Sequence, residues 1–547
     1  MSWRRAFVVT DISFQKFRAT TRLFGDFLYD FKKVEPFLGR TFREGVSCAA
    51  VAERVQAGRY ARKEAAAILA EQNRVFGSGQ KTFENLKRFE KSDSLGVFGG
   101  QQGGLFGGPI FTLYKMWTVL HLAEKLEREL GRPVVPFFWL AGDDHDFAEV
   151  SSTRVVDKNN RLIKLEYSPR TFPQGLPMGR VRFDETIAST FGQWDDAFNP
   201  SDFKKEVFDK LSSAYRAGRS FPEAFASWMN QLLGDSGLVW VNPNDSGLKE
   251  LAVDFFVDEL GLDGTSQAKV TTVNEQLRAS NYHVQVHKTE ELLNLFYQPE
   301  KRETVRKSNG GFLTETGRRF SAKELRDEVR RSPGDFSPNV LLRPVLQSHL
   351  FPVVAAVLGP SEVAYFAQIG PLFDLHKLPF PVLWPRKSVT LLESKVTNVL
   401  KKHNLSVLDF ADDAEVLLGR LIREGEGKAL EATSEAVRKA VKDSIERLKV
   451  ELAEIDPTLE KTAEQVKAKL DLELQNLEKK GIAAAKKKNE VLREQVFRTR
   501  ELLFPEGVLQ ERILNASYFL VKYGFELLPR IKNQINFENF DHQVVSL

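Results

Sequence analysis

The sequence has little cysteine, no long apolar run and no marked excess of either charge. Its single cysteine, Cys48, excludes a disulfide framework and a thiolate metal cluster, and indicates a reducing compartment such as the cytoplasm. No segment reaches the ~18 apolar residues that span a bilayer, and the start, MSWRRAFVVTDISF, is too short in apolar residues for a signal peptide. Lysine plus arginine number 78 against 74 for aspartate plus glutamate, without a basic block. We therefore expect neither a membrane nor a nucleic acid as partner.

Several common catalytic and cofactor motifs are also missing. The chain has no GxxxxGK[ST] or GxGxxG nucleotide fingerprint and no GxSxG nucleophile elbow. His283 and His287 bound the segment His-Val-Gln-Val-His, whose alternation is typical of a strand, and no third ligand type lies nearby. We therefore predict no zinc site and assign no residue as a metal ligand.

Composition and apolar patterning divide the 547 residues into four segments. Residues 1–94 are predicted to be mostly helical and to pack on a core. Residues 95–425 read as an α/β core, and residues 426–504 as an antiparallel coiled coil. Residues 505–547 are expected to form a C-terminal helix that returns to the core.

The α/β prediction depends on the order of elements after Gly96. An apolar run, a glycine-rich turn, a long segment with helical apolar spacing and the run VVPFFWLAG follow one another. A strand, a helix and a strand in this order imply a right-handed crossover and a parallel pair, the opening of a doubly wound sheet. Further strands are expected at Leu238–Asn242, His283–His287, Val340–Val345 and Val382–Trp384.

Two long helices are predicted after Gly427, where the chain becomes rich in alanine, lysine, glutamate and leucine. Apolar residues step by three and four on either side of Asp456-Pro457, where proline ends the first helix and suits the start of the second. The pair should fold back as an antiparallel coiled coil. Such a coiled coil carries no chemistry by itself, and an arm or a dimer contact is its simplest role.

The glycine-rich turn is the first candidate site. Gly100, Gln101, Gln102, Gly104 and Gly107 lie between a strand and a helix, where glycine lets backbone amides approach a ligand and the helix start favours an anion. The turn suits a carboxylate, a phosphate or a sugar. A tight turn needed only for packing strand against helix is the alternative.

The second candidate follows the next strand, in AGDDHDFAEV. Asp143, Asp144, His145 and Asp146 stand at the carboxyl end of a strand, the edge at which parallel sheets bind ligands. They can hold Mg²⁺, orient an amine, or keep His145 as a proton carrier. The bland alternative is an aspartate that caps the next helix and a half-buried histidine.

Two later segments have a similar character. In NVLLRPVLQ we expect a strand that carries Arg343 and Gln347 near its end, and in GPSEVAYFAQ a helix start that offers Ser361 and free amides to an anion. In PRKS, Arg386 and Lys387 form a plausible carboxylate or phosphate clamp. A structural cap and a solvated charge pair are the respective alternatives.

These motifs together resemble one enzyme family. GQQGGLFGGPIFTLYK, GRPVVPFFWLAGDDHDFAEV, NVLLRPVLQ, GPSEVAYFAQ, PRKS and LLFPEGVLQERILN follow in the order found in the cysteine-adding enzymes of bacillithiol biosynthesis, the BshC family. The resemblance extends from residue 95 to the C-terminus. It implies a Rossmann-like core with connecting segments, a coiled coil, a homodimer, and a ligase that joins the carboxylate of cysteine to the amino group of glucosaminyl malate.

Amide formation in water requires that the carboxylate oxygen become a leaving group, so an acyl adenylate or acyl phosphate route with ATP and Mg²⁺ is expected. Within this ligase we assign Asp144, His145 and Asp146 to catalysis, and the turn, Asp143 and the later candidates to substrate or phosphate. A nucleotide contact is also expected where the coiled coil meets the core, at Gly507, Gln510 and Arg512; a docking helix is the alternative there.

Two other functions are compatible with the same residues. One is another nucleotide-dependent ligase, or a nucleotidylyl transferase, that acts on a different small acid. The other is a noncatalytic dimeric scaffold that binds a metabolite. The clustered carboxylates argue against the scaffold, because crowding charges costs several kcal/mol unless a ligand or hydrogen bonds compensate.

Overall fold

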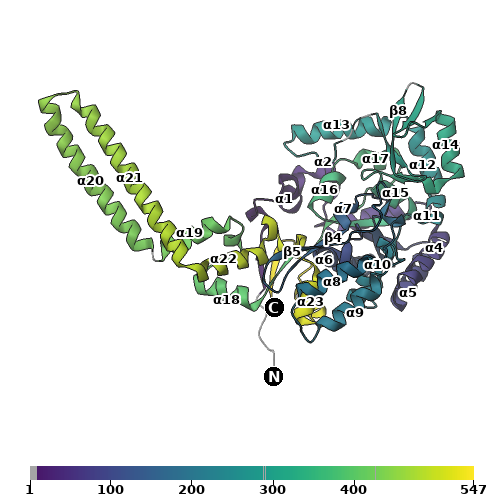
Figure 1. The fold of residues 1–547 in the computed structure, drawn as a ribbon. Helices are drawn as coiled ribbons and strands as arrows, with labels where there is room; N and C mark the ends of the chain where they lie inside the picture. Colours follow the sequence, from purple (N-terminus) through teal and green to yellow (C-terminus); the bar gives the residue numbers. More distant parts are fainter. Residues whose placement is uncertain (1–8, 288, 290, 309, 426) are drawn as a thin grey trace. The chain divides into compact units, whose positions relative to one another are not determined.

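The computed structural model describes residues 9–287, 289, 291–308, 310–425 and 427–547 (Figure 1). Residues 1–8, part of the segment in which no signal peptide was expected, and residue 426, at a predicted boundary, lie outside the described residues. The chain forms two compact units. One takes the chain up to Thr390 together with Glu511–Val545, and the other consists of Leu391–Gln510 and Ser546–Leu547.

The larger unit is built on a five-stranded parallel sheet with the order β13-β12-β2-β3-β6. The predicted strands after Gly96, over VVPFFWL, at Leu238–Asn242 and at Val382–Trp384 are all confirmed, and every pairing between neighbouring strands is parallel. The sheet therefore has the predicted Rossmann-like α/β character. The strand bounds are β2 Leu95–Gln101, β3 Val134–Leu140, β6 Val239–Val241, β12 Val353–Leu358 and β13 Val382–Pro385.

Helices cover both faces of β3. Successive side chains of a strand point to opposite sides, so neighbouring residues of β3 contact different helices. Phe137 meets Phe89 of α5 (Gln80–Phe89), with ring centroids 5.3 Å apart. Phe138 lies on the other face, which α6 (Phe111–Leu130) covers. Gly99 of β2 allows this close packing, because a Cβ there would lie 2.7 Å from Val119 of α6 and 3.4 Å from Phe138. All seven side chains of β3 are buried, which explains its unbroken apolar sequence.

Two predicted strands are wrong. His283–His287 has no strand pairing and forms an irregular segment. Val340–Val345 runs into helix α15 (Arg343–Leu350), because the Asn339 side chain accepts from the amides of Leu341 and Leu342 and Pro344 suits the first turn. Local capping therefore outweighs the strand propensity of the apolar run.

A second sheet, antiparallel with the order β10-β9-β8-β7-β11, lies between β6 and β12 in the chain. It was not predicted from the sequence: β8 (ETVRKS) is polar and β9, β10 and β11 have only four, two and three residues, so the apolar run of β7 (LLNLFY) stood alone. Its strands are β7 Leu292–Tyr297, β8 Glu303–Ser308, β9 Gly311–Thr314, β10 Arg319–Phe320 and β11 Phe336–Pro338.

The described part of the first 94 residues is mainly helical but also contains strand β1 (Val9–Ile12). β1 pairs antiparallel with the last strand, β15 (His542–Ser546), from Val9 with Val545 to Ile12 with His542. The chain end therefore forms a strand in addition to helices α23 (Ala516–Tyr523) and α24 (Leu527–Gln534).

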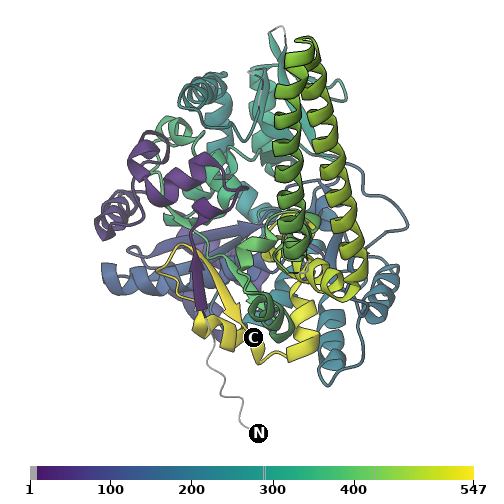
Figure 2. The same ribbon diagram turned by 90° about the vertical axis from the view of Figure 1, so that its left-hand side faces the viewer.

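The smaller unit contains the predicted coiled coil. Helices α20 (Gly427–Ile455) and α21 (Leu459–Lys488) lie side by side as a hairpin that turns at Asp456-Pro457 (Figure 2). Helices α18 (Ser394–His403) and α19 (Ala414–Glu424) belong to the same unit, because both pack on α22 (Glu490–Leu503). The structural division thus lies at Thr390, earlier than the predicted boundary at 425. No helix among the described residues is both long and apolar enough to cross a membrane.

Candidate functional site

A cavity of 790 Å³ lies in the larger unit at the carboxyl ends of β2, β3 and β12. Its volume is in the range of small-molecule sites, about 300–1,000 Å³. Ten of the predicted residues line it: Gly100, Gln101, Gln102, Gly104, Asp143, Asp144, Arg343, Ser361, Arg386 and Arg512. The structure therefore brings residues from distant parts of the sequence to the predicted edge of the sheet.

The glycine-rich turn contributes side chains to the cavity, whereas several of its backbone amides form hydrogen bonds within the turn. The amides of Gly104, Gly107 and Gly108 donate to carbonyl oxygens of Gln102, Gly104 and Leu105, respectively, within the turn itself. Gly107 is not among the lining residues; its φ is 91°, and a Cβ there would lie 2.8 Å from Met229 and 2.9 Å from Trp228. Gly107 is therefore explained by turn geometry and packing.

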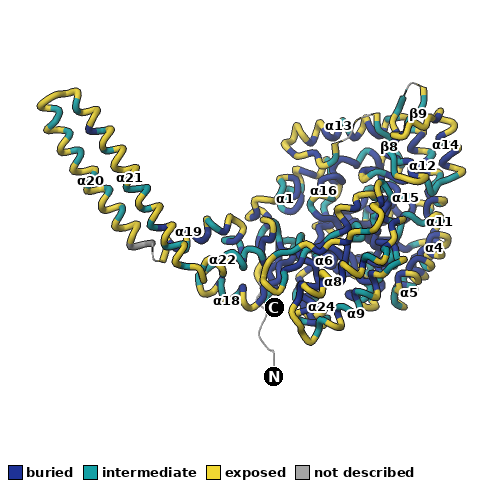
Figure 3. Tube along the Cα trace, viewed as in Figure 1, coloured by how far each residue is buried: buried dark blue, intermediate teal, exposed yellow. Residues whose placement is uncertain are grey.

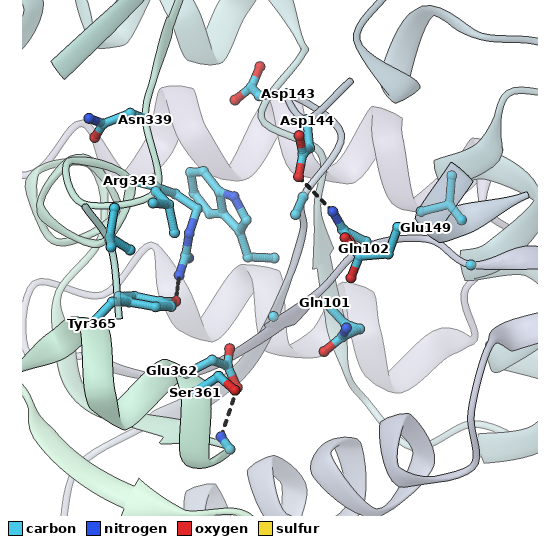
Figure 4. Close-up of a pocket in the computed structure, with 18 of the residues that line it drawn as sticks. Gln101, Gln102, Asp143, Asp144, Glu149, Asn339, Arg343, Ser361, Glu362 and Tyr365 are labelled. Atoms are coloured by element: carbon cyan, nitrogen blue, oxygen red, sulfur yellow. Dashed lines mark hydrogen bonds between the residues drawn. The ribbon is translucent and has the colours of Figure 1, made fainter. Parts of the chain in front are cut away.

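One side of the cavity is acidic and consists of Asp143, Asp144 and Glu149. Asp144 accepts a 2.6 Å hydrogen bond from Gln102 Nε2 (Figure 4). It also accepts one of 2.8 Å from the amide of His145. Arg302 Nη1 lies 3.5 Å from the same carboxylate. Asp144 is 38% exposed, so its carboxylate is oriented by these donors and remains accessible to a ligand.

Asp143 is held differently from its neighbour. It is buried, forms a 3.0 Å ion pair with Lys249 and accepts from Asn244 Nδ2 at 2.9 Å. Lys249 also donates to the carbonyl of Phe336 in β11, at 2.9 Å. Burial lowers the pKa of Lys249 and the charge of Asp143 opposes that shift. Asp143 thus joins the end of β3 to the second sheet.

His145 and Asp146 are not among the residues that line the cavity. His145 is 44% exposed, and its Nδ1 lies 3.3 Å from Arg302 Nη1. Asp146 caps the short helix α7 (Phe147–Val150) by accepting from the amide of Glu149 at 3.1 Å. The capping alternative thus describes Asp146, while Asp144 faces the cavity.

The opposite side is cationic and consists of Lys115, Arg343, Arg386 and Arg512. Arg343, which leads α15, donates to Tyr365 Oη at 2.6 Å and to Gln347 Oε1 at 3.3 Å. Both acceptors are uncharged: burial raises the pKa of Tyr365 to about 12. Gln347 does not line the cavity, and Arg343 is oriented there by two uncharged acceptors; its hydrogen bond to Tyr365 is drawn in Figure 4.

Arg386 is fixed on several sides at once. It forms a buried 2.8 Å ion pair with Glu511, donates to the carbonyl of Lys387 at 3.0 Å and lies 4.7 Å from the Phe111 ring centroid. Desolvation and the charge of Arg386 lower the pKa of Arg512 beside it. Arg386 and Arg512 together carry two positive charges against the single negative charge of Glu511, which leaves this side positive.

Lys387 does not complete the clamp expected in PRKS. Its ammonium donates to the carbonyl oxygens of Asn539 and Asp541, at 2.5 and 3.1 Å, and the residue is not among those that line the cavity. It ties the segment to the chain end instead.

Gly507 and Gln510 belong to the smaller unit. The Gln510 amide group donates to the carbonyls of Leu391 and Leu502, at 3.0 and 2.7 Å, and accepts from the amide of Leu391 at 2.8 Å. Gly507 ends a short turn with a φ of 79°. Both residues have structural roles in that unit, and the nucleotide contact expected there stays a prediction.

The lining residues that were not predicted from the sequence include three charged ones, Lys115, Glu149 and Arg302. Lys115 could have been predicted from the sequence, since a lysine among the apolar residues of a buried helix requires a partner for its charge. Glu149 stood inside the quoted segment AGDDHDFAEV; burial raises its pKa, as do the charges of Asp144 and Asp146, while Gln102 opposes the shift. Arg302 lies in the polar loop between β7 and β8, and no feature of the sequence marks it as a site residue.

Among the described residues, no group of three or more histidine, cysteine, aspartate or glutamate side chains is arranged to hold a metal ion. A Mg²⁺ ion bound with a nucleotide needs only one or two carboxylates, because phosphates and water complete its shell.

Comparisons with known proteins identify the family. Residues 9–387 match the family model described as "Bacillithiol biosynthesis BshC, N-terminal Rossmann-like domain", and residues 389–547 match "Bacillithiol biosynthesis BshC, C-terminal coiled-coil domain". Proteins named "Putative cysteine ligase BshC" are similar over nearly the whole chain. The protein of Salinibacter ruber is 34% identical and covers 96% of both chains, and that of Bacillus cytotoxicus is 28% identical over 89% of this chain and 91% of its own. With both domains matched and the predicted parallel sheet and helical hairpin in place, this chain belongs to the BshC family of bacillithiol biosynthesis.

Proposed function

We propose that this chain is a carbon–nitrogen ligase that joins the carboxylate of cysteine to the amino group of glucosaminyl malate, forming bacillithiol. The names of its relatives supply the reaction class. The observation that carries the proposal is the cavity, which has an accessible carboxylate, Asp144, on one side and an excess of positive charge on the other. The substrates have the complementary pattern, because one contributes an amine and both carry carboxylates.

The acidic side suits the attacking amine. Asp144, held by Gln102 and Arg302, can accept hydrogen bonds from the ammonium form and place its nitrogen in the cavity. The amine must lose a proton before it attacks a carboxyl carbon. Glu149 lines the same side, and its raised pKa brings it nearer to neutral pH as a proton acceptor.

The cationic side suits the anionic groups. Arg343 can bind a carboxylate or phosphate through its planar guanidinium, while Ser361 offers a hydroxyl from the start of α16 (Pro360–Phe366). ATP fits this donor set, and when bound it would supply the leaving group that activates the cysteine carboxylate. Arg343, Arg386 and Arg512 would hold its phosphate groups. ATP and Mg²⁺ are part of the proposal.

The proposal is tested with the purified protein, L-cysteine, glucosaminyl malate, ATP and Mg²⁺, with bacillithiol measured by mass spectrometry. We expect product only when both substrates are present, and none from Asp144→Ala. A deletion strain should accumulate glucosaminyl malate and be rescued only by the wild-type gene. If product formed without ATP, the role of ATP would be excluded, but the ligase proposal itself would stand. Activity with another acid in place of cysteine would favour the alternative ligase, and an unchanged thiol profile in the deletion strain would overturn the proposal.

We also propose a homodimer, formed in the cytoplasm through the helical hairpin. Within the smaller unit, most of α20 and α21 is exposed (Figure 3). Their exposed residues include large apolar ones such as Leu448, at 48%, and Leu477, at 65%. Light scattering should give twice the 62.1 kDa chain mass, and Leu448→Lys with Leu477→Lys should give the monomer. Val46→Lys, at an exposed residue of the larger unit, is the control that should remain dimeric. A monomeric wild-type protein would contradict the proposal.

A further inference from the structure

Lys115 is a buried lysine whose hydrogen bonds are all used inside the protein. Its side chain on α6 is 1% exposed. Its ammonium donates to the carbonyl of Gly100 at 2.8 Å, to Gln101 Oε1 at 3.0 Å and to Glu362 Oε2 at 2.6 Å. An ammonium group has three N–H donors, so Lys115 has none left for a ligand. It therefore acts through its partners.

Those partners come from two separate walls of the cavity. Gly100 and Gln101 end β2, whereas Glu362, 247 residues away from Lys115 in sequence, lies in the first turn of α16 after β12. The same Glu362 oxygen accepts from the amide of Gly359 at 2.7 Å. Gln101, Gly359 and Glu362 all line the cavity. One ammonium thus sets the distance between the glutamine turn and the α16 start.

The charge of Lys115 has a second consequence. Burial lowers the pKa of Lys115, and the charge of Glu362 opposes that shift. The pair is neutral as a whole, so the positive excess on the cationic side comes from the arginines. Without Lys115, the charge of Glu362 would no longer be paired and would reduce the positive excess of the wall that receives anionic groups, and Gln101 Oε1 would lose its donor.

We propose that Lys115 is the positioning residue of this site: it holds Gln101 against the start of α16 and cancels the charge of Glu362, so that the anionic end of the substrate is accepted. This inference rests on the proposed function for the identity of the substrate. It assigns Lys115 no contact with substrate and no proton transfer. Glu362 is its partner, and the arginines remain the groups that bind the anion.

The proposal predicts a specific pattern in a pair of substitutions. Lys115→Met should weaken binding of glucosaminyl malate at least tenfold, because Glu362 then repels its carboxylates. Lys115→Met combined with Glu362→Gln should recover most of the affinity, because the neutral amide no longer repels the anion and can still accept from Gly359. Lys125→Met is the matched control: Lys125 lies on the same helix but pairs with Glu538, and its substitution should leave the affinity unchanged.

The measurement is isothermal titration of the full-length proteins with glucosaminyl malate, with unfolding curves recorded for each variant. Equal affinity of wild type, Lys115→Met and the double variant would overturn the positioning role while leaving the ligase proposal intact. A double variant no better than Lys115→Met, though folded, would also overturn it, because the repulsion argument would be wrong. If the wild-type protein bound no glucosaminyl malate, both the proposed function and this inference would fail.

Discussion

Asp143→Ala is expected to lower the free energy of unfolding by about 3–5 kcal/mol, the cost of leaving one partner of a buried ion pair alone. Lys249 is 2% exposed, and its 3.0 Å contact with Asp143 is its one carboxylate partner among the described residues. After the substitution the ammonium would keep the carbonyl of Phe336 but lose its counter-charge. Chemical denaturation measures the loss.

The control is Asp143→Ala combined with Lys249→Met, which removes both charges. We expect the double variant to be markedly more stable than Asp143→Ala alone, because no unpaired charge remains buried. A loss below about 1 kcal/mol for Asp143→Ala would contradict the prediction, since that is the cost typical of an exposed pair.

The same variant should show a characteristic pH dependence. Burial already lowers the folded-state pKa of Lys249, and removal of Asp143 takes away the charge that opposes this shift. The folded variant therefore loses the Lys249 proton at a lower pH than the folded wild type, and in the window between these two pH values only the variant binds more protons unfolded than folded. The stability of Asp143→Ala relative to wild type should therefore rise as the pH is raised through that window.

Asp144→Asn should reduce kcat/KM for bacillithiol formation by about 100-fold, equivalent to about 2.7 kcal/mol of transition-state stabilisation. The asparagine keeps the size of the side chain and can still accept from Gln102, but it loses the negative charge that we propose holds the substrate ammonium. Steady-state kinetics with varied glucosaminyl malate measure the effect.

Two neighbouring substitutions are the controls. Asp146→Asn preserves a good helix cap outside the cavity, and His145→Gln changes an exposed side chain that does not line it. Both should keep activity within a few-fold of wild type. If His145→Gln lost as much activity as Asp144→Asn, the sequence-based assignment of His145 to proton transfer would be favoured over the cavity geometry. Full activity of Asp144→Asn would show that the charge of Asp144 is not needed for the reaction and would contradict the role proposed for it.

Local pattern was sufficient for the elements whose periodicity is strong. The unit from β2 through α6 to β3 and the hairpin of α20 and α21 follow from apolar spacing, glycine and proline positions, which act within one or two helical turns. The pattern gave the wrong element at Val340–Val345, where a cap and a proline favour a helix over a strand. It was also wrong at His283–His287, where the alternating residues do not pair with another strand.

The sequence by itself determined the parallel sheet, the helical hairpin, and the edge at which Gln101, Gln102 and Asp144 meet, because parallel strands end on the same side. Only the tertiary structure decided how the consecutive acids are used: Asp143 pairs with Lys249, Asp144 faces the cavity, and Asp146 caps a helix. It also decided that Lys115 meets Glu362. Direction along a turn and contacts between distant segments depend on how the whole chain packs, and short-range periodicity carries no information about either.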